Sequence, residues 1–569
     1  MKRLAVQNLS VSFFNETKYS KALDNLTFEL ASGEILAIVG ESGSGKSITA
    51  LAIMGLLTKN KKCQISGLIE FFSEQGNILN LNQLSDKEFT NIRGKHLAMI
   101  FQEPMSALNP VYTCGKQLME CLELHQSGNK NEIYKQALKL LAEVRIDEVE
   151  RIMNSYPFQI SGGQRQRVMI AMALAGSPEV LIADEPTTAL DASVRNSILH
   201  LIKDIVKERK MSLLLISHDL HSVADISDKT IVLFRGKKVE ENQTAKVFKD
   251  PQHPYTKALI NCQPVYAAKE TVLPTPEDFY RLTAEIQFLE KEFDRNALLK
   301  LPSKTERDVL IKAKNLNLTF SRINGLFKKN EQKQVLNNLS FEIYQSETLG
   351  LLGESGSGKS SIAKIFTGLI PNYRGLISFE GKDINGFKRK QLSKKIQLIF
   401  QDAFSALNPM MRVGDVLVEV LLVHQIETSK KTALEKAAVL LEQVGLETTD
   451  LKKYPHQFSG GQRQRINIAR ALALQPELII MDESVSALDV SVQAQIINLL
   501  NQLQEEYGFT YLFISHDVDV MAYFSDRVMV LESGTIKEIG ITNEVFANPK
   551  DAYTRKLLEA SGRKFLTNH

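Results

Sequence analysis

The sequence predicts an α/β protein built from two copies of one domain, each arranged around a parallel β-sheet. Three observations lead to this prediction. The octapeptide GESGSGKS occurs at residues 40–47 and again at 353–360. A longer stretch at 156–191, which contains SGGQRQR and ends in DEPTTALD, has a counterpart at 454–489. Around these motifs short apolar runs alternate with helical stretches, which is typical of strands buried on both faces of a parallel sheet.

The repeated motifs divide the chain into two halves and a linker. The motif residues between Ser161 and His218 stand at one constant interval from their counterparts between Ser459 and His516. This interval is too long for a solenoid repeat and indicates a duplicated domain. We expect one domain at 1–262, a linker at 263–309, a second domain at 310–562 and a tail at 563–569. Apolar residues recur at helical spacing in the linker and predict one amphipathic helix that packs on a neighbouring half: Leu282, Ile286, Leu289 and Phe293.

The bulk composition excludes several classes of protein. A formal net charge of +3 on 569 residues gives no indication of a nucleic-acid partner. The four cysteines form no CxxC pair, so neither a disulfide framework nor a zinc or iron–sulfur site is indicated. No run approaches the ~18 apolar residues that span a bilayer, and the N-terminus lacks the apolar core of a signal peptide. We therefore expect a chain of the reducing cytoplasm; if it works at a membrane, other chains cross that membrane.

In each half, four apolar runs end in polar residues. EILAIVG enters the glycine loop, HLAMIFQ ends at Gln102, VLIADE ends at Asp184 and Glu185, and LLLISH ends at His218. The second half repeats this pattern, with polar ends at Gln401, Asp482, Glu483 and His516. Ligands of open α/β sheets bind beyond the carboxyl ends of the strands. We therefore expect these side chains to gather at one edge of each sheet.

The repeated octapeptide fits the phosphate-binding pattern GxxxxGK[ST] between a strand and a helix. Its glycines let backbone N–H groups converge on phosphate oxygens, and the helix N-terminus adds positive potential. Lys46 and Lys359 are expected to hold the β- and γ-phosphates of ATP, and Ser47 and Ser360 to ligate Mg²⁺. A turn that merely caps a helix would not need this lysine and serine. The predicted ATP-binding residues here are Gly40, Glu41, Ser42, Gly43, Ser44, Gly45, Lys46, Ser47, Ile48, Gly353, Glu354, Ser355, Gly356, Ser357, Gly358, Lys359, Ser360 and Ser361.

Each DE pair adds candidate catalytic carboxylates. Asp184 and Asp482 suit coordination of Mg²⁺, directly or through water. Glu185 and Glu483 are candidates for the base that orients the attacking water, a role typically worth ~10²–10⁴-fold in rate. Alone, such a pair could be a solvated strand end. Beside a phosphate-binding loop it indicates phosphoryl chemistry.

The SGGQ motif predicts a second anion site in each half. Ser161 and Ser459 precede helical stretches and are expected to be N-caps, and the following glycines permit close approach of the backbone. A helix N-terminus of this kind attracts an anion. One domain does not need two γ-phosphate sites, so we expect the halves to face each other and share nucleotides. The predicted residues are Ser161, Gly162, Gly163, Gln164, Ser459, Gly460, Gly461 and Gln462.

In this order, the glycine loop, SGGQ, DE, ALD and SH resemble the ABC-type ATPases over both halves. The resemblance implies two nucleotide-binding domains, each with a RecA-like core, an antiparallel β subdomain and a helical subdomain. It also implies head-to-tail stacking, with ATP between the P-loop of one half and the SGGQ of the other, and two hydrolytic sites. The catalytic residues that it implies are Glu185, Glu483, His218 and His516, and the residues at the metal are Ser47, Gln102, Asp184, Ser360, Gln401 and Asp482. It also implies that Asp191 and Asp489 couple the two sites. Phe13 and Phe320 would stack on adenine, although both positions suit a strand core equally well.

Finer strings resemble the oligopeptide/dipeptide importer ATPases, in particular the fused ATPase of peptide and microcin C importers. FQEPMSALNP, FQDAFSALNP and DPQHPYTKALI carry this resemblance; HPYTK suits an ordinary surface turn as well. It implies an inner-membrane peripheral protein on the cytoplasmic face, with two permease subunits and a solute-binding protein as partners. Permease helices would dock on the regions 103–155 and 402–456. No cysteine cluster follows PYT, so no iron–sulfur cluster is expected.

The predicted function is that of an ATP-hydrolysing motor subunit that powers import of peptide-class cargo, which it does not contact itself. The alternative is a soluble tandem ATPase that acts on ribosomes as a translation factor. The linker is nearly neutral in charge, which argues against that alternative because an arm that binds ribosomes should be basic. The sequence names neither the cargo nor the role of the linker.

Overall fold

The chain divides into two compact units. The structure, a computed structural model, describes residues 1–15, 18–57, 62–102, 107–187, 192–262, 272–282, 288–290, 308–322, 331–485 and 488–560. The first unit comprises Met1–Cys262 with Pro276–Phe293, and the second comprises Gln263–Thr275 with Asp294–His569. The linker expected at 263–309 is thus shared between the two units. No helix in these described ranges is long and apolar enough to cross a bilayer.

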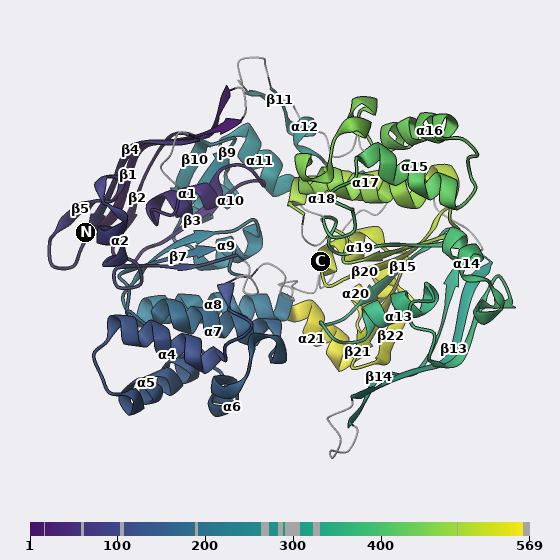
Figure 1. The fold of residues 1–569 in the computed structure, drawn as a ribbon, viewed down its shortest axis with the longest axis horizontal. Coiled ribbons are helices and arrows are strands. Elements are labelled where there is room, and N and C mark those ends of the chain that lie inside the picture. Colours follow the sequence, from purple (N-terminus) through teal and green to yellow (C-terminus); the bar gives the residue numbers. More distant parts are fainter. Residues whose placement is uncertain are drawn as a thin grey trace. The chain divides into compact units, whose positions relative to one another are not determined.

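A six-stranded sheet forms the core of the first unit, in the order β10-β9-β3-β8-β7-β6 (Figure 1). Five strands are parallel, and β10 pairs antiparallel with β9 at one edge. Every residue of β3, β7 and β8 is buried, which explains their unbroken apolar sequences. The strands are β3 (Ile35–Val39), β6 (Leu97–Ile100), β7 (Val180–Asp184), β8 (Ser212–Ile216), β9 (Lys229–Phe234) and β10 (Lys237–Gln243).

A four-stranded antiparallel sheet of order β2-β1-β4-β5 packs on this core. Its apolar residues share one buried cluster with Leu36 and Ile38 of β3. The strands are β1 (Lys2–Asn15), β2 (Lys18–Ala31), β4 (Cys63–Phe72) and β5 (Ile78–Asn80). Helices near the two sheets are α1 (Lys46–Ile53), α2 (Asp86–Thr90), α8 (Ala192–Glu208), α9 (Leu220–Ile226), α10 (Thr244–Lys249) and α11 (Pro254–Asn261).

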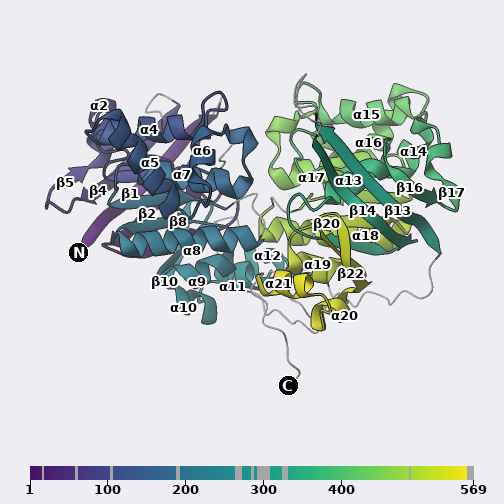
Figure 2. The ribbon, with the colours of Figure 1, turned by 90° about the horizontal axis from the view of Figure 1, so that it is seen from below.

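Four further helices form a helical layer, seen together in Figures 1 and 2. They are α4 (Cys114–His125), α5 (Lys130–Glu143), α6 (Val149–Asn154) and α7 (Gly162–Leu174). In α5 the buried residues follow helical spacing, and Asn129 begins the helix with a capping box to Glu132. The predicted parallel core, antiparallel subdomain and helical subdomain are all present in this unit.

The second unit repeats the architecture, with a core sheet of order β18-β19-β20-β15-β21-β22 and an antiparallel sheet of order β14-β13-β16-β17. Its strands are β13 (Val309–Arg322), β14 (Glu331–Tyr344), β15 (Thr348–Leu352), β16 (Arg374–Phe379), β17 (Lys382–Asp383), β18 (Ile396–Ile399), β19 (Leu478–Asp482), β20 (Thr510–Ser515), β21 (Arg527–Glu532) and β22 (Thr535–Ile541). Its helices are α13 (Lys359–Phe366), α14 (Arg389–Lys395), α15 (Val413–Val423), α16 (Lys430–Gln443), α17 (Gly460–Leu472), α18 (Val490–Tyr507), α19 (Val518–Phe524), α20 (Thr542–Ala547) and α21 (Ala552–Ala560).

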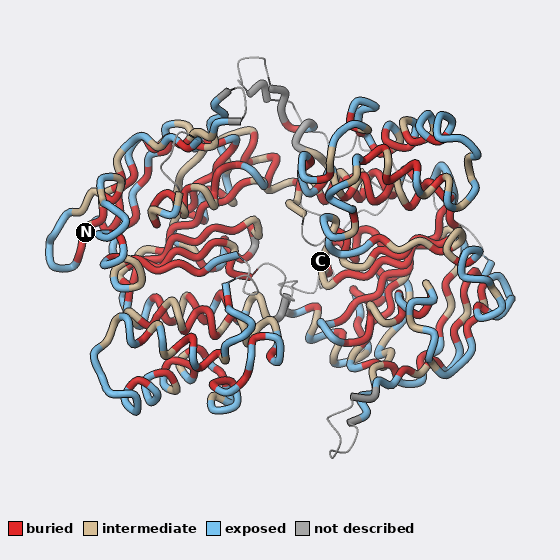
Figure 3. Tube along the Cα trace, in the orientation of Figure 1, coloured by how far each residue is buried: buried red, intermediate tan, exposed pale blue. Residues whose placement is uncertain are grey.

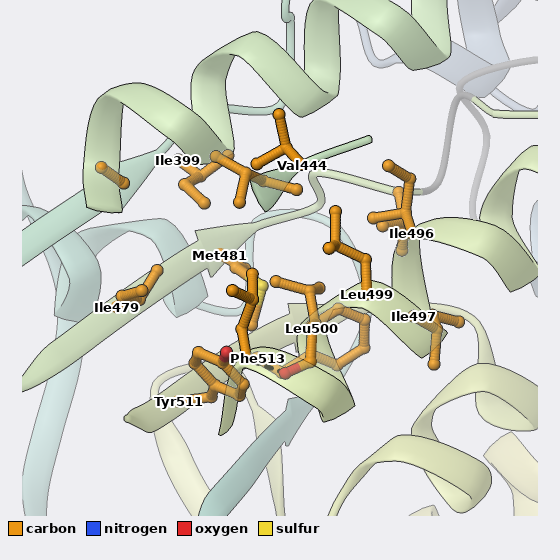
Figure 4. Close-up of a cluster of buried hydrophobic side chains, with 14 of the residues drawn as sticks. Ile399, Val444, Ile479, Met481, Ile496, Ile497, Leu499, Leu500, Tyr511 and Phe513 are labelled. Carbon is orange, nitrogen blue, oxygen red and sulfur yellow. Dashed lines mark hydrogen bonds between the residues drawn. The ribbon is translucent and has the colours of Figure 1, made fainter. Parts of the chain in front are cut away.

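Both faces of this second core sheet are covered. Ile479 and Met481 of β19 belong to one buried cluster, and the alternating Leu478 and Ile480 belong to another. Figure 3 shows the burial concentrated along the strands, and Figure 4 shows α18 packing on one face. Each buried aliphatic or aromatic side chain contributes about 1.5–3 kcal/mol, so this two-sided burial is what holds the strand ends in register.

The helix predicted for the linker is wrong at the described residues. A short helix α12 (Pro276–Phe279) leads into β11 (Tyr280–Leu282), which pairs antiparallel with β12 (Phe288–Glu290). The register sets Leu282 opposite Phe288, whereas the prediction placed Leu282 on a helix face. A short apolar segment fits both periodicities, and strand pairing supplies backbone partners that sequence spacing does not reveal. Ile286 and Phe293 lie outside the described residues.

An earlier part of the linker belongs to the second unit. Leu273 is buried in the cluster that includes Val520 and Tyr523. Its backbone N–H donates to Asn498 Oδ1 at 2.9 Å, and its carbonyl accepts from Asn498 Nδ2 at 2.8 Å. One asparagine of α18 therefore satisfies both backbone groups of Leu273, as a neighbouring strand would.

Candidate functional sites

In each unit the glycine loop joins the first core strand to the following helix with a left-handed turn. Gly45 precedes α1 with φ +104°, and Gly358 precedes α13 with φ +107°. A Cβ at Gly45 would lie 2.5 Å from Leu23 Cδ2, and one at Gly358 would lie 2.6 Å from Leu336 Cδ2. Both the conformation and the close packing therefore require glycine at this position.

The two loop lysines are buried and bond to their own loops. Lys46 Nζ donates to the carbonyl oxygens of Gly40 at 2.7 Å and Glu41 at 2.9 Å. Lys359 makes the equivalent bonds at 2.6 and 2.9 Å. Each ammonium group is thus held against the first two residues of its loop, close to the backbone that would surround a phosphate.

A buried hydroxyl in each loop fits a phosphate oxygen. Ser44 is 4% exposed and Ser357 is 5% exposed, and neither Oγ has a hydrogen-bond partner among the described residues. Burying a hydroxyl without a partner is costly. An incoming phosphate would accept these bonds, so the loops suit a polyphosphate ligand.

In each unit the loop serine pairs with the aspartate that ends a core strand, β7 in the first unit and β19 in the second. Ser47 Oγ donates to Asp184 Oδ1 at 3.0 Å, and Ser360 donates to Asp482 at 3.0 Å. Burial raises the pKa of Asp184 to about 6; the neighbouring Glu185 adds to the rise, while the Ser47 bond opposes it. Burial also raises the pKa of Asp482. A hydroxyl beside a buried carboxylate is a donor set that Mg²⁺ accepts.

The glutamate that follows is contacted from both neighbouring strands. Gln102 Nε2 donates to Glu185 Oε2 at 2.8 Å, and His218 Nδ1 lies 3.2 Å from the same oxygen. The polar ends of three strands therefore meet at Glu185, as the strand pattern predicts.

The second unit has the same glutamine, glutamate and histidine at its strand ends, but the histidine lies farther from the glutamate. Gln401 donates to Glu483 at 2.8 Å, whereas His516 Nδ1 lies 3.7 Å from Glu483 Oε1, beyond hydrogen-bond distance. Burial acts to raise the pKa of Glu483, but His516 and the charge of Lys359 outweigh it and leave that pKa lowered. The carboxylate is thus held ionised.

Both glutamates have a left-handed backbone that the sequence does not reveal. Glu185 has φ +46° and Glu483 has φ +49°. This region is sparsely populated by residues other than glycine and asparagine. The backbone N–H groups stay paired, with the carbonyls of Ile216 at 2.9 Å and Ile514 at 3.0 Å. Strain of this kind concentrates at functional positions.

The SGGQ segments begin helices, as predicted. Ser161 Oγ accepts from the Gln164 N–H at 3.2 Å, and Gln164 Oε1 accepts from the Ser161 N–H at 3.1 Å. Ser459 and Gln462 form the same capping box. A Cβ at Gly163 would lie 2.8 Å from Val194, so the second glycine also lets α8 approach α7. The N-cap predictions are therefore confirmed.

Phe13, Phe320 and Asp489 are not among the residues whose contacts join the strand ends. Phe13 is partly buried against the core of the first unit, whereas Phe320 is 48% exposed. Asp489 occupies the N-cap position of α18, and Asp191 lies outside the described residues. Within the ranges that the structure describes, no group of three or more His, Cys, Asp or Glu side chains could hold a metal ion.

Sequence reasoning missed one contact at the loop. HPYTK suited a surface turn, but Tyr255 is completely buried and its hydroxyl accepts a hydrogen bond from the Glu41 N–H at 3.1 Å. The only signal in the sequence was the repetition of a YT pair, at Tyr255 and Tyr553, near the end of both halves.

The fold and the sites together define a tandem pair of P-loop ATPase domains. Residues 23–188 and 336–486 match the sequence profile of the ABC transporter family, and residues 239–283 match that of the oligopeptide/dipeptide transporter C-terminal region. The chain belongs to the ABC transporter family and is an ABC transporter ATPase. The predicted fold class and family are confirmed.

Relatives match along nearly the whole chain. The glutathione import ATP-binding protein GsiA of Shigella dysenteriae serotype 1 (strain Sd197) is 44% identical over 566 residues, which cover 98% of this chain and 89% of that protein. The protein of the same name from Escherichia coli (strain K12) shows the same identity and coverage. A solved dimeric ATP-binding cassette with bound ADP and Pi is 30% identical, covers 42% of this chain and 98% of its own, and has a TM-score of 0.38.

Proposed function

We propose that this chain powers the import of small peptide-like molecules through separate permease subunits, and that two ATP sites drive the transport. The near full-length similarity to glutathione import ATP-binding proteins supports the direction and the class of cargo. The C-terminal region typical of oligopeptide/dipeptide transporters points the same way and argues against an ATPase that acts on ribosomes. The domain boundaries proposed are 1–262 and 310–562.

Each ATP site is proposed to use the P-loop and strand-end residues of one half and the SGGQ segment of the other. The first site comprises Gly40–Ile48, Gln102, Asp184, Glu185 and His218, completed by Ser459–Gln462. The second comprises Gly353–Ser361, Gln401, Asp482, Glu483 and His516, completed by Ser161–Gln164. Each half carries a P-loop and a second anion-binding helix N-terminus, and this supports the exchange. Asp191 and Asp489 are proposed to couple the sites, and Phe13 and Phe320 to stack on adenine.

The binding step exchanges partners at the loop. Lys46 leaves the carbonyls of Gly40 and Glu41 and contacts the β- and γ-phosphates, while the buried Ser44 hydroxyl gains an acceptor. Ser47, Asp184 and the amide oxygen of Gln102 would hold Mg²⁺, which would supply positive charge beside the phosphate oxygens. The second loop has the same set of groups.

Glu185 performs the proton chemistry. Its carboxylate accepts a hydrogen bond from the attacking water, orients the water oxygen toward the γ-phosphorus and receives the proton as the new P–O bond forms and the bond to ADP breaks. The His218 ring, 3.2 Å away, holds the carboxylate in place. Gln102 donates to the same carboxylate, and we propose that it reports the nucleotide state through this bond.

Exposed apolar side chains beside both glutamines suit permease docking. Phe101, Val111 and Tyr112 are 41–70% exposed in the first unit, and Phe400 and Met410 are 43% and 84% exposed in the second. Exposed apolar groups of this kind mark protein interfaces. We place the chain on the cytoplasmic face of the membrane, bound to two permeases that work with a solute-binding protein.

Purification from solubilised cells tests this proposal. The tagged chain should bring down two polytopic permeases, and vesicles containing that complex should take up glutathione or a short peptide only with ATP on the side of the ATPase. A variant with Lys46→Ala and Lys359→Ala serves as the inactive control. Recovery of ribosomal proteins without permeases would contradict the transport function.

A further inference from the structure

The last helix of each nucleotide-binding domain carries a tyrosine that reaches the P-loop. Tyr255 is the second residue of α11, and its hydroxyl accepts the Glu41 N–H at 3.1 Å. Tyr553 is the second residue of α21, and its hydroxyl accepts the Glu354 N–H at 3.2 Å. The same contact forms at both loops although the sequences around the two tyrosines differ. This indicates that the tyrosine hydroxyls have a function besides packing.

A glutamate on the neighbouring strand fixes the start of each helix. Glu240 of β10 accepts the N–H groups of Gln252 and His253, both at 3.0 Å. Glu538 of β22 accepts those of Lys550 at 3.1 Å and Asp551 at 3.2 Å. Both halves thus pin the turn that precedes the tyrosine to the edge of the core sheet.

The N-cap residue then sets the backbone of the tyrosine itself. His253 Nδ1 accepts the Tyr255 N–H at 3.1 Å, and Asp551 Oδ1 accepts the Tyr553 N–H at 2.7 Å. Histidine and aspartate perform the same task with different chemistry. The position of the tyrosine is therefore maintained even where the residues that maintain it differ.

Ring packing fixes the remaining freedom in the first unit. The Tyr255 ring lies 4.5 Å from the Phe234 ring of β9. The preceding residue, Leu233, has its carbonyl oxygen against the loop, where a Cβ on Gly40 would lie only 2.2 Å away. The hydroxyl and the start of the loop are thus held against the same strand.

Glu41 is consequently held from two sides. Its N–H donates to Tyr255, while its carbonyl accepts from Lys46. Lys46 must leave that carbonyl to contact a phosphate, whereas the tyrosine contact can persist. We infer that Tyr255 and Tyr553 are positioning residues that keep the first peptide groups of each P-loop in the conformation that binds ATP. This inference rests on the ATP sites proposed above and places control of ATP affinity in the C-terminal helix.

Tyrosine-to-phenylalanine variants of the full chain test the inference, because they remove the hydroxyl and keep the ring. The effect of Tyr255→Phe is measured in a chain that also carries Lys359→Ala, and that of Tyr553→Phe in a chain that also carries Lys46→Ala. Each lysine substitution disables the other ATP site, so that only one site binds nucleotide at a time. The Kd of a fluorescent ATP analogue is measured by titration, and KM and kcat by phosphate release. Tyr511→Phe in the Lys46→Ala background is the control, because Tyr511 is completely buried like Tyr255 and its hydroxyl donates to Leu500 O at 2.9 Å, away from the loop.

Loss of one hydrogen bond should raise Kd and KM about three- to tenfold and leave kcat within about twofold, while the control changes neither beyond about twofold. Unchanged Kd and KM in both folded variants would overturn the inference. A fall in kcat with constant KM would also overturn it, since that indicates loss of folded enzyme. If Tyr255→Phe fails to fold, the Kd and KM of Tyr553→Phe alone test the inference, because Tyr553 is only half-buried. Parent chains that bind no analogue would instead overturn the proposed ATP sites and this inference with them.

Discussion

Gln102 and Glu185 are joined by a 2.8 Å hydrogen bond between the ends of two neighbouring parallel strands, β6 and β7. The amide nitrogen of Gln102 is used in this bond, which leaves its oxygen available to a cation. The same bond, also 2.8 Å long, joins Gln401 and Glu483. One side chain in each site can therefore respond both to the metal and to the carboxylate proposed to activate water.

Replacing each glutamate by glutamine separates the charge from the hydrogen bond. In Glu185→Gln and Glu483→Gln the new amide oxygen still accepts from the neighbouring glutamine, but no carboxylate remains to receive a proton. Each single variant should lose at least about half of the steady-state ATPase activity, and the double variant about 10²–10⁴-fold. Phosphate release by the purified chain measures this. Full activity in either single variant would contradict the claim of two hydrolytic sites.

The raised pKa of Asp184 predicts a pH-dependent stability. A carboxyl that binds its proton more tightly when folded stabilises the fold below its unfolded pKa near 4, and that stabilisation is lost as pH rises through about 6. Asp184→Asn removes this loss and should raise Tm relative to wild type at pH 7.5 in EDTA without nucleotide. The unfolding free energies of the variant and the wild type should differ by at most about 3 kcal/mol at pH 7.5, and this difference should be smaller at pH 5. An equal difference at both pH values would show that another cause is responsible.

Much of this fold could be predicted from the sequence because burial on both faces leaves an unbroken apolar signature. The first four residues of β19, LIIM, alternate between two buried clusters on opposite faces, so each of these four positions must be apolar. The strand-end residues followed from the same logic, because Gln102, Glu185 and His218 come from strands that lie side by side.

What the sequence did not predict depends on tertiary contacts or on weak local preferences. The hydroxyl of Tyr255 meets a loop more than two hundred residues away, and no local pattern encodes that contact. The left-handed backbone of Glu185 follows from its surroundings, since glutamate has no preference for it. The linker hairpin was mistaken for a helix because three-residue strands such as β11 are too short to show a period.

The second glycine of SGGQ has a packing role that can be tested apart from nucleotide binding. A Cβ at Gly461 would lie 2.3 Å from Val492 Cγ1, whereas one at Gly460 would lie 3.8 Å from its nearest neighbour, Leu488. Gly461→Ala should therefore cost about 1–3 kcal/mol of unfolding free energy. Gly460→Ala, the matched control, should cost less than about 1 kcal/mol. Urea denaturation without nucleotide measures both, and Gly461→Ala with Val492→Ala should recover part of the loss. Equal costs for the two single variants would contradict the packing explanation.

Asn498 should be the residue that attaches the linker to the second unit. Its side chain satisfies both backbone groups of Leu273, at 2.9 and 2.8 Å. Asn498→Ala leaves the buried Leu273 segment with two unsatisfied polar groups, each worth about 1–3 kcal/mol. The segment should then detach before the unit unfolds, so trypsin should cut the linker at Lys269 faster while the domain core stays intact. Gln502→Ala, on an exposed face of the same helix, is the control and should leave the cleavage rate unchanged. If Asn498→Ala is cut no faster than this control, the hydrogen bonds do not hold the linker, and burial of the Leu273 side chain is sufficient.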